Sequence, residues 1–508
     1  MTAGTIIERH LGGVRAAVDA SDALRLPGGD ALARVLALMT GNRPAKALEM
    51  LAPLVDGPAI ACVARVLEAV LLDATGRRGD AKAVLARFLE DPDAGYDMLC
   101  LAGDLFLDWR MAGEACRAYD RAVALAPHSS HAILRRGKAL SEAGEVTGAL
   151  DDLRRATLLQ PNLAEAHRAL GDELRDASMP EAAIASYRRA LEIDAADETA
   201  AAALEALIAS LVPAWHAAML NDARRNDAFD AAIRRAVGHY AAAHGGSADG
   251  MHVLDIGTGT GLLAMMAARA GAGRVTACES VGPLADIARY IVARNGMADR
   301  IAVLHGRSTG LEVGVDLPRR ADLLTAEIVD AGLLGEAILP TIADARARLL
   351  APDAPVIPCA AAVFAMPVES AGIDAERRVD RAAGFDISAF NRLAPKLYLQ
   401  TDLAKYDWRP LAAPAVLFRF DFTRAAPEAG ETSARVIPRS DGTAHAVALW
   451  FELSLDGETT LATGPMDPPT HWKQAVFALE TPVALNRNDP VRLTARHDGR
   501  RIRLALGG

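Results

Sequence analysis

Apolar and polar positions follow three different patterns along the chain. Up to about residue 211, apolar residues recur with the spacing of amphipathic helices. From residue 252, the short apolar run HVLDI leads into a glycine-rich turn and then into another apolar helical stretch. From about residue 366, the runs LFRFDF and VALWFELSL alternate with the period of two that is typical of strands. The sequence therefore predicts a helical part, an α/β part and a strand-rich part, in that order.

Small residues recur every 34 positions in the helical part. The three series with this step are Gly103, Gly137 and Gly171; Ala115, Ala149 and Ala183; and Ala122, Ala156 and Ala190. A small residue at a helix crossing lets two antiparallel helices approach closely, and this period and pattern are those of the tetratricopeptide repeat (TPR). They predict five helix pairs over residues 28–197 and a capping helix at 198–211. The alternative, an all-helical domain with coincidental spacing, does not explain several positions in one register.

The turn after residue 256 has the pattern of a nucleotide-binding loop. The strand carrying Asp255 is followed by GTGTG at 257–261, and the next strand, 275–278, ends at Glu279. An acidic side chain at the end of this second strand can accept both hydroxyls of a ribose. The spacing GxGxG favours S-adenosylmethionine (SAM), which has no pyrophosphate, over a dinucleotide. A dehydrogenase and a glycine turn without any ligand are the alternatives.

Two carboxylates follow the strand predicted at 321–326. Glu327 ends that strand, and Glu336 follows nine residues later in a loop where Gly332 and Gly335 allow a tight return. Two acids facing one pocket beside a sulfonium donor indicate a cationic substrate, because a guanidinium offers five N–H donors in a planar fork. The alternative is that Glu336 is a solvated acid at the start of a helix.

The composition and charge of the chain limit the kinds of molecule that it is expected to bind. Apolar residues make up 51% of the chain, charged residues 24% and aromatics 5%, and the formal charge is −10. The acidic balance disfavours a nucleic-acid partner and suits basic ones. The five cysteines are scattered, so neither a metal site nor a disulfide framework is expected, and a reducing cytoplasm fits best. No signal segment, membrane span or membrane partner is expected.

Five segments of the chain resemble the protein arginine N-methyltransferase family, in the family's order. They are MLNDARRN, VLDIGTGTGLL, VTACE, EIVDAGLLGE and PTHWKQAVF. The resemblance spans roughly residues 212–508, and the double-Glu loop and the Thr-His-Trp loop are its most specific signatures. TPR repeats ahead of this core are similar to the TPR-containing branch of the family. Relatives there carry two methyltransferase modules in tandem, whereas this chain has room for one.

The resemblance implies a role for each matching residue. Glu327 and Glu336 match the pair that binds the target guanidinium, and Met219 matches a residue packed at the transfer site. His471 matches the loop histidine, and Asp222 matches the acid that it contacts. The matching SAM-binding residues are Arg225 for the carboxylate, Asp255, Gly257 and Gly259 for the donor turn, and Glu279 for the ribose. Where many members have a Glu near the adenine, this chain has GRST at 306–309, so Ser308 is the weak candidate there.

Together these observations predict a multidomain chain with SAM as cofactor. An N-terminal helical segment (1–27) precedes an all-α TPR solenoid (28–211), a Rossmann-like SAM-dependent methyltransferase domain (212–365) and a C-terminal β-barrel (366–508). The resemblance places a dimerisation arm at about 371–411 and implies a homodimer. The expected substrate is arginine in a protein, and the expected partner of the TPR concave face is a protein or an element of the same chain.

Two other functions remain open at the level of sequence. One is a SAM-dependent methyltransferase of a small molecule, against which the double-Glu loop and His471 argue. The other is a TPR scaffold whose SAM-binding domain no longer transfers a methyl group, against which the intact Glu327, Glu336 and Arg225 argue. The type of methylated product is not determined by the sequence.

Overall fold

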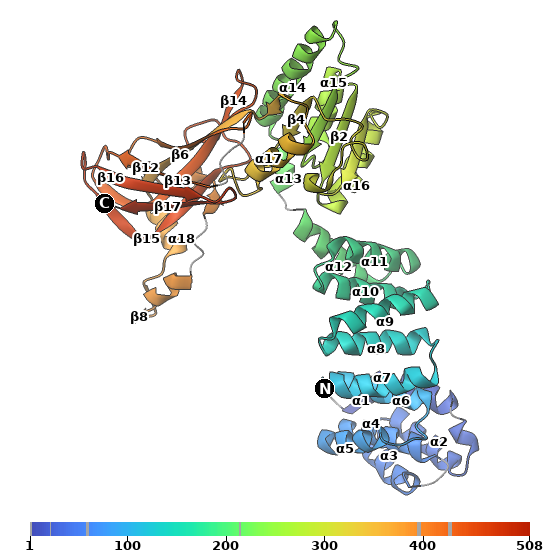
Figure 1. The fold of residues 1–508 in the computed structure, drawn as a ribbon. Helices are drawn as coiled ribbons and strands as arrows, with labels where there is room; N and C mark the ends of the chain where they lie inside the picture. Colours follow the sequence, from blue (N-terminus) through green and yellow to red (C-terminus); the bar gives the residue numbers. More distant parts are fainter. Residues whose placement is uncertain are drawn as a thin grey trace. The chain divides into compact units, whose positions relative to one another are not determined.

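The computed structural model describes residues 3–20, 22–56, 60–212, 215–393, 398–424 and 429–507. The chain divides into two compact units, Met1–Ser210 and Leu211–Gly508, which are described separately below (Figure 1). Among the described residues, no helix has the length and apolar character needed to cross a membrane.

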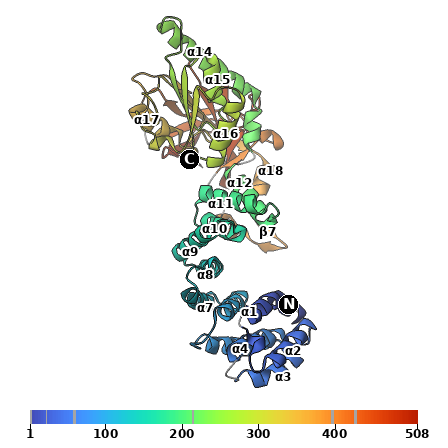
Figure 2. The same cartoon turned by 90° about the vertical axis from the view of Figure 1, so that its right-hand side faces the viewer.

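The first unit is built from antiparallel helix pairs. An N-terminal helix, α1 (Ala3–Ala20), precedes them. The pairs are α2 (Gly29–Thr40) with α3 (Pro44–Leu51), α4 (Ala61–Ala74) with α5 (Arg78–Phe88), α6 (Tyr96–Asp108) with α7 (Ala112–Leu125), α8 (Ser130–Glu142) with α9 (Val146–Leu159), and α10 (Ala164–Asp176) with α11 (Pro180–Ile193). A further helix, α12 (Glu198–Leu211), follows. The helices stack pair upon pair, so the predicted TPR solenoid is confirmed (Figure 2).

The glycines of the 34-residue register lie at the helix crossings. A Cβ atom at Gly103 would lie 2.5 Å from the ring of Tyr119, and one at Gly171 would lie 2.7 Å from the ring of Tyr187. The two tyrosines are fully buried and donate to Asp104 (2.6 Å) and Asp172 (2.8 Å). Glycine leaves room in these two pairs because the first helix rests directly on an aromatic ring of the second, whereas in the α8–α9 pair Gly137 faces Leu153 instead.

A second periodic series ties each repeat to the one before it. Arg121 donates to the carbonyls of Leu89 (2.6 Å) and Asp91 (2.5 Å), and Arg155 donates to the carbonyl of Pro127 (2.5 Å). Arg189, one further step of 34, donates to the side chain of Asn162 at 3.2 Å. These arginines satisfy polar groups of the turns between repeats, which helices alone leave without partners.

The second unit begins with helices and a parallel sheet. Its helices are α13 (Trp215–Leu220), α14 (Ala223–Ala243), α15 (Leu262–Ala270), α16 (Gly282–Arg294) and α17 (Ile338–Arg348). Its strands are β1 (His252–Ile256), β2 (Arg274–Glu279), β3 (Ile301–His305), β4 (Leu323–Ala326) and β5 (Val356–Ile357). All pairings are parallel, in the order β3-β2-β1-β4-β5. The chain order therefore reverses between β1 and β4, and ligands bind at the carboxyl ends of strands beside such a reversal.

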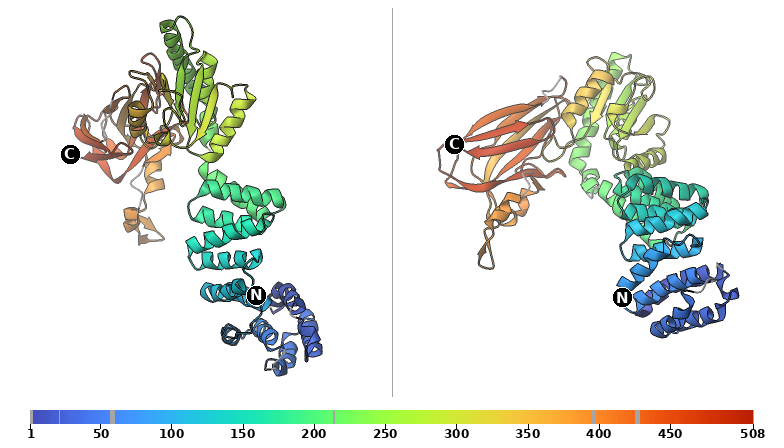
Figure 3. Two further views of the ribbon diagram at one scale, coloured as in Figure 1. Left: turned by 45° about the vertical axis from the view of Figure 1, so that its right-hand side comes forward. Right: turned by 60° about the horizontal axis from the view of Figure 1, so that its bottom comes forward.

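The rest of this unit is antiparallel. Its longer strands are β6 (Ala360–Glu369), β11 (Ala415–Asp421), β12 (Gly430–Val436), β13 (Gly442–Ser454), β15 (Gln474–Leu485), β16 (Val491–His497) and β17 (Ile502–Gly507). The short strands are β9 (Leu399–Thr401), β10 (Arg409–Pro410) and β14 (Thr460–Ala462). One sheet contains β10-β6-β13-β15-β9 with β11 and β14 attached, and a second contains β12-β16-β17. Figure 3 shows these strands in orange and red. One continuous apolar core joins them to the parallel sheet, and the predicted fold class is confirmed.

The range 371–411 contains both sheet strands and a protruding segment. β9 (Leu399–Thr401), η5 (Leu403–Lys405) and β10 (Arg409–Pro410) stand in or between strands of the large sheet. The preceding part holds α18 (Ala371–Arg377), β7 (Arg381–Ala382), β8 (Phe385–Asp386) and η4 (Ser388–Leu393). Residues 394–397 of this range lie outside the described residues. The dimerisation arm at about 371–411 stays a prediction, and two short strands of the large sheet lie within this range.

Candidate active site

The two glutamates of the double-Glu loop lie on one cavity of about 60 Å³. Glu327 follows the last residue of β4 and is buried, whereas Glu336 remains accessible to solvent. The loop closes because the Asp330 carboxylate accepts the N–H of Gly335 at 2.9 Å. A Cβ atom at Gly335 would lie 2.2 Å from that carboxylate. Glycine at this position thus lets the loop turn back tightly enough to bring Glu336 to Glu327.

The cavity concentrates negative charge. Although Glu336 as a whole residue is exposed, desolvation of its carboxyl group at the cavity, with Glu327, Asp330 and Glu279 nearby, raises its pKa to about 8. Burial also raises the pKa of Glu327, although the Arg225 guanidinium favours the ionised form. A cation that enters such a cluster interacts favourably with it, because the cation stabilises the ionised form of each carboxyl group.

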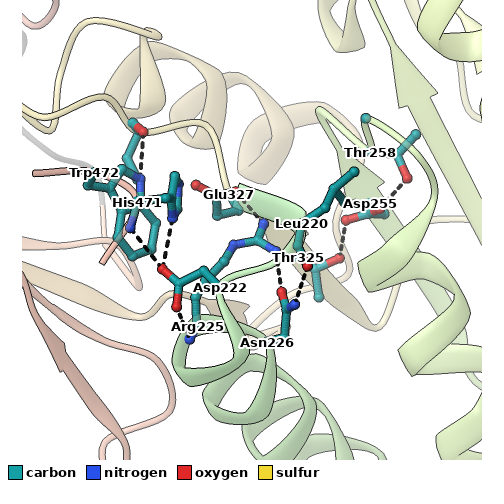
Figure 4. Close-up of polar contacts among 12 residues, drawn as sticks. Leu220, Asp222, Arg225, Asn226, Asp255, Thr258, Thr325, Glu327, His471 and Trp472 are labelled. Atoms are coloured by element: carbon teal, nitrogen blue, oxygen red, sulfur yellow. Dashed lines mark hydrogen bonds and ion pairs between the residues drawn. The ribbon is translucent and has the colours of Figure 1, made fainter. Parts of the chain in front are cut away.

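Asp222 joins the loop that carries His471 to the start of α14. Asp222 caps this helix by accepting the N–H of Arg225 at 3.0 Å. Its other carboxylate oxygen lies 3.0 Å from both the backbone N and Nδ1 of His471 (Figure 4). Burial lowers the pKa of His471 to about 4, so the ring is neutral at pH 7. The indole of Trp472 donates to the Val329 carbonyl at 3.0 Å, which fixes the same loop to the double-Glu loop.

Arg225 and Glu327 form a buried ion pair. The Nη2 atom of Arg225 bonds the Glu327 carboxylate, and Nη1 donates to Asn226 at 2.8 Å. Nε of Arg225 is buried with no hydrogen-bond partner among the described residues. The residue expected to bind the SAM carboxylate therefore contacts the residue expected to bind the substrate, and it keeps one unused donor.

The donor turn is held by side chains from neighbouring strands. Asp255 accepts hydroxyl bonds from Thr258 (2.5 Å) and from Thr325 (2.6 Å) across the β1–β4 pair. Glu279 accepts the N–H groups of Gly259 and Val281, each at 2.9 Å. Gly257 has a φ of 73°, and a Cβ atom there would lie 2.4 Å from Ile328. The turn therefore requires glycine, and a side chain would push it against the double-Glu loop.

These residues fit SAM as a cofactor. A Cβ atom at Gly259 would have open space around it, as expected of a backbone that a ligand approaches closely. Glu279 stands at the end of β2 with lone pairs left for ribose hydroxyls, and the unused Nε of Arg225 can donate to a carboxylate. The carboxylate and the ribose of SAM therefore each have a candidate partner at the carboxyl ends of the strands, and the glycine turn there leaves room for the ligand.

The structure gathers most of the predicted site residues. Glu327, Glu336, Met219 and His471 line the cavity, and Asp222 contacts His471 directly. Ser308 is apart from them, buried in a short 3₁₀ turn after β3 with its carbonyl bonded to Arg348 at 3.0 Å. Its place beside an adenine stays a prediction.

Five further residues line the cavity that sequence reasoning did not assign to the site. They are Trp215, Val329, Asp330, Gln400 and Trp472. Val329 and Asp330 stand in the double-Glu loop, so their position in the sequence was a usable signal. Gln400 reaches the cavity because β9 pairs with β15 next to the Thr-His-Trp loop, and its side chain donates to the Trp472 carbonyl at 3.2 Å. No sequence pattern indicates such a pairing.

Comparisons with known families agree with this geometry. The pattern of the arginine methyltransferase oligomerization subdomain matches residues 359–503. That of ribosomal protein L11 methyltransferase (PrmA) matches residues 243–357, and that of the tetratricopeptide repeat matches residues 164–197. All three parts of the chain thus have a family counterpart.

Individual relatives carry arginine methyltransferase names. The chain is 41% identical over 282 residues to the arginine N(omega)-methyltransferase of Streptomyces achromogenes subsp. streptozoticus, covering 56% of this chain and 75% of that protein. It is 33% identical over 319 residues to protein arginine N-methyltransferase 7 of Drosophila melanogaster, covering 55% of this chain and 46% of that one. It is 33% identical over 309 residues to protein arginine N-methyltransferase 1.6 of Arabidopsis thaliana, covering 55% and 41%. The chain spans less than half the length of these plant and insect relatives.

A solved structure shows the same fold. The PRMT1 enzyme–prozyme heterotetrameric complex with AdoHcy from Trypanosoma brucei is 26% identical, with a TM-score of 0.51. The match covers 59% of this chain and 93% of that one. The chain belongs to the arginine methyltransferase family, and it is a SAM-dependent arginine methyltransferase with TPR repeats.

Proposed function

We propose that Glu327 and Glu336 bind the guanidinium of an arginine in a protein substrate and present one of its nitrogens for methylation. The observation that carries this proposal is that both glutamates lie on one cavity that also contains Met219 and His471. SAM supplies an activated methyl group on a sulfonium. The residues of this chain supply the binding, the orientation and the charge distribution.

The glutamates act on a group that is hard to methylate. Arginine keeps its proton at neutral pH, and its nitrogen lone pairs are delocalised over the guanidinium. Two carboxylates on one side of the group concentrate the positive charge there and leave the other nitrogen more nucleophilic. They also fix its direction, and such positioning supplies much of the rate in a two-substrate reaction.

The Asp222–His471 pair braces the site. Asp222 binds the backbone and the ring of His471 and also caps α14, so one carboxylate joins the helix to the Thr-His-Trp loop. Arg224 adds to this joint by donating to the carbonyls of Ala462 (3.1 Å) and Pro468 (2.8 Å). A braced loop keeps the cavity closed on the side opposite the glutamates.

The substitution Glu327→Gln tests the assignment. It keeps the size of the side chain but removes the charge, so methylation should fall by at least about 10²-fold, comparable to the loss of one electrostatic stabilising group. SAM binding, measured by calorimetry, should survive. Glu431→Gln on the exposed strand β12 is the matched control and should leave turnover unchanged. Wild-type turnover in the Glu327→Gln variant would contradict the assignment.

The class of substrate is tested with labelled SAM and arginine-rich peptides, followed by hydrolysis to amino acids. Labelled methylarginine in the peptide supports a protein substrate and reports the type of product. Label on free arginine or another metabolite alone would instead support a small-molecule methyltransferase. SAM binding without any transfer would support a scaffold.

The partners are proposed from surface properties. A homodimer is supported by the match to the oligomerization subdomain and by the exposed apolar side chains between β8 and η4. The TPR repeats are proposed to recruit a protein substrate or partner. Every cysteine of the chain is a free thiol, which supports a reducing, cytoplasmic location.

A further inference from the structure

The N-terminal helix α1 (Ala3–Ala20) lies outside the 34-residue register of the solenoid. It packs against α2, α4 and α6, which are the first helices of three successive pairs (Figure 2). In a TPR solenoid the first helices line the concave face, where ligands bind. Each of these helices also packs against the second helix of its own pair. The solenoid contacts are therefore complete without α1, which occupies the concave face as an added element.

One face of α1 makes this contact. Ile7, Val14 and Val18 are buried, with His10 between them on the same side of the helix. The spacing is that of the apolar face of an amphipathic helix that lies in a groove. At Gly13 the helix lies against α6, where a Cβ atom would be in ordinary van der Waals contact with Leu101 at 3.7 Å.

A charge contact fixes the direction of α1. Asp108, at the end of α6, lies 3.0 Å from Arg9 and 3.0 Å from His10. On the other side, Arg15 donates to the hydroxyl of Thr40 at 2.7 Å. Asp108 bonds only to α1 among the ion pairs of the described residues, whereas Asp104 on the same helix is paired with Arg135 of the solenoid. Asp104 and Asp73 also lie near His10 but are paired within the solenoid, so Asp108 is the acid that the groove offers for an ion pair to the helix that occupies it.

The chemistry of the concave face changes along the solenoid. Leu101 has an equivalent in every neighbouring repeat at the step of 34: Leu67 before it, and Arg135 and Ala169 after it. The leucines are buried, and Arg135 instead forms an ion pair with Asp104. Leu67 on α4, Leu101 on α6 and Asp108 at the end of α6 belong to an apolar groove that α1 occupies beside α2.

We propose that this groove of α4 and α6 is a binding site for an amphipathic helix of a partner protein, and that α1 is an internal occupant which the partner displaces. The partner helix has an apolar stripe and a basic residue placed to meet Asp108. This site is independent of the methyl-transfer site, so the two can fail separately in experiments.

The sequence of α1 makes it a weak competitor. Gly12 and Gly13 stand in its middle, and glycine is the poorest helix former apart from proline. Because α1 is tethered, it competes at an effective concentration on the order of millimolar. A partner helix with better helix-forming residues can overcome the high effective concentration of α1, because less of the partner's binding free energy is spent on ordering its own backbone as a helix.

A peptide exchange experiment on the full chain tests the proposal. The probe is a fluorescent peptide of residues 3–20 carrying Gly12→Ala, a position where a Cβ atom would meet nothing within 4 Å. We expect binding by anisotropy, with faster hydrogen exchange of α1 in the chain as the probe replaces it. In the chain itself, Gly12→Ala strengthens the internal helix and should weaken probe binding about fivefold. Val14→Ser in the chain should strengthen probe binding by at least tenfold.

Control peptides establish where the probe binds. A probe carrying Arg9→Glu and His10→Glu meets Asp108 with like charge and should bind at least tenfold more weakly. Methyltransferase activity and circular dichroism report that each chain variant is folded. The proposal is overturned if the probe binds the Gly12→Ala and Val14→Ser chains with equal affinity, or if it binds while the exchange of α1 stays unchanged. Absence of binding to the Val14→Ser chain overturns it as well.

Discussion

Glu336 and His471 line the same cavity, and their pKa values are displaced in opposite directions. The pKa of Glu336 is raised to about 8 by burial and by three neighbouring carboxylates, whereas the pKa of His471 is lowered to about 4. At pH 7 the free chain therefore carries a protonated Glu336 and a neutral His471. Guanidinium binding needs the ionised carboxylate, so substrate binding releases a proton.

The pH dependence of catalysis follows from this titration. kcat/KM reports groups of the free enzyme, so it should rise about tenfold per pH unit below pH 8 and level off above it. Glu336→Gln should lower kcat/KM and abolish this limb. Activity measured with an arginine peptide between pH 6 and 9.5 checks the expectation. A limb of the same midpoint in the Glu336→Gln variant would assign it to another group.

The same raised pKa has a consequence for stability. A carboxyl group with a raised pKa in the folded state stabilises the fold while it is protonated, and this contribution is lost as the pH rises through 8. In the absence of ligands, Glu336→Gln should therefore melt above the wild-type temperature at pH 9, and this advantage should shrink at pH 6. The melting temperatures of the variant therefore report how the Glu336 charge affects stability, separately from its effect on catalysis.

At the scale of elements, two glycines of one helix pair have different surroundings. In α6, Gly103 leaves room for the Tyr119 ring, and alanine would place a methyl group within 2.5 Å of it. Gly113 in α7 has open space around its Cβ direction. The two glycines differ in packing while both belong to helices of the same pair.

Alanine at these two positions should have opposite effects. Gly103→Ala overpacks the crossing and should destabilise the solenoid by about 1–3 kcal/mol. Gly113→Ala removes only the conformational freedom of glycine and should stabilise it by at most about 1 kcal/mol. Urea unfolding of the two variants, followed by circular dichroism, provides the comparison. Equal effects would mean that the Tyr119 contact does not limit the residue at position 103.

At the scale of the whole molecule, the segment from β8 to η4 exposes an unusual number of apolar side chains. Phe385 is 73% exposed, Phe390 62% and Leu393 77%. On α16 of the same unit, Ile287 and Tyr290 are also exposed. Apolar surface of this kind marks an interface, which supports the homodimer proposed above.

The double substitution Phe385→Ser and Phe390→Ser should convert a dimer into a monomer. It removes two aromatic side chains from the proposed interface and none from the core, so the melting temperature of the monomer should be little changed. Light scattering measures the mass, and methylation should fall with it. Leu158→Ser, at a leucine that is 80% exposed on the solenoid, is the control and should leave the mass unchanged.

The sequence alone determined the repeat, the strand–turn–helix unit and the double-Glu loop. Each depends on local spacing: a step of 34 for Gly103 and its equivalents, glycines directly after β1, and two acids nine residues apart. Such patterns are defined by spacing along the chain, so they are visible before folding. The family resemblance then extended these patterns to Asp222, Arg225 and His471.

Only the tertiary structure decided what these residues contact. Glu327 and Arg225 are 102 residues apart, and Asp222 and His471 are 249 apart. Gln400 enters the cavity through the pairing of β9 with β15, and α1 lies on the concave face through contacts with helices far along the chain. No local pattern encodes these contacts, because they arise from the burial of apolar faces in a shared core. The sequence thus identified the residues that carry the chemistry, and tertiary packing determined which of them share a cavity or a groove.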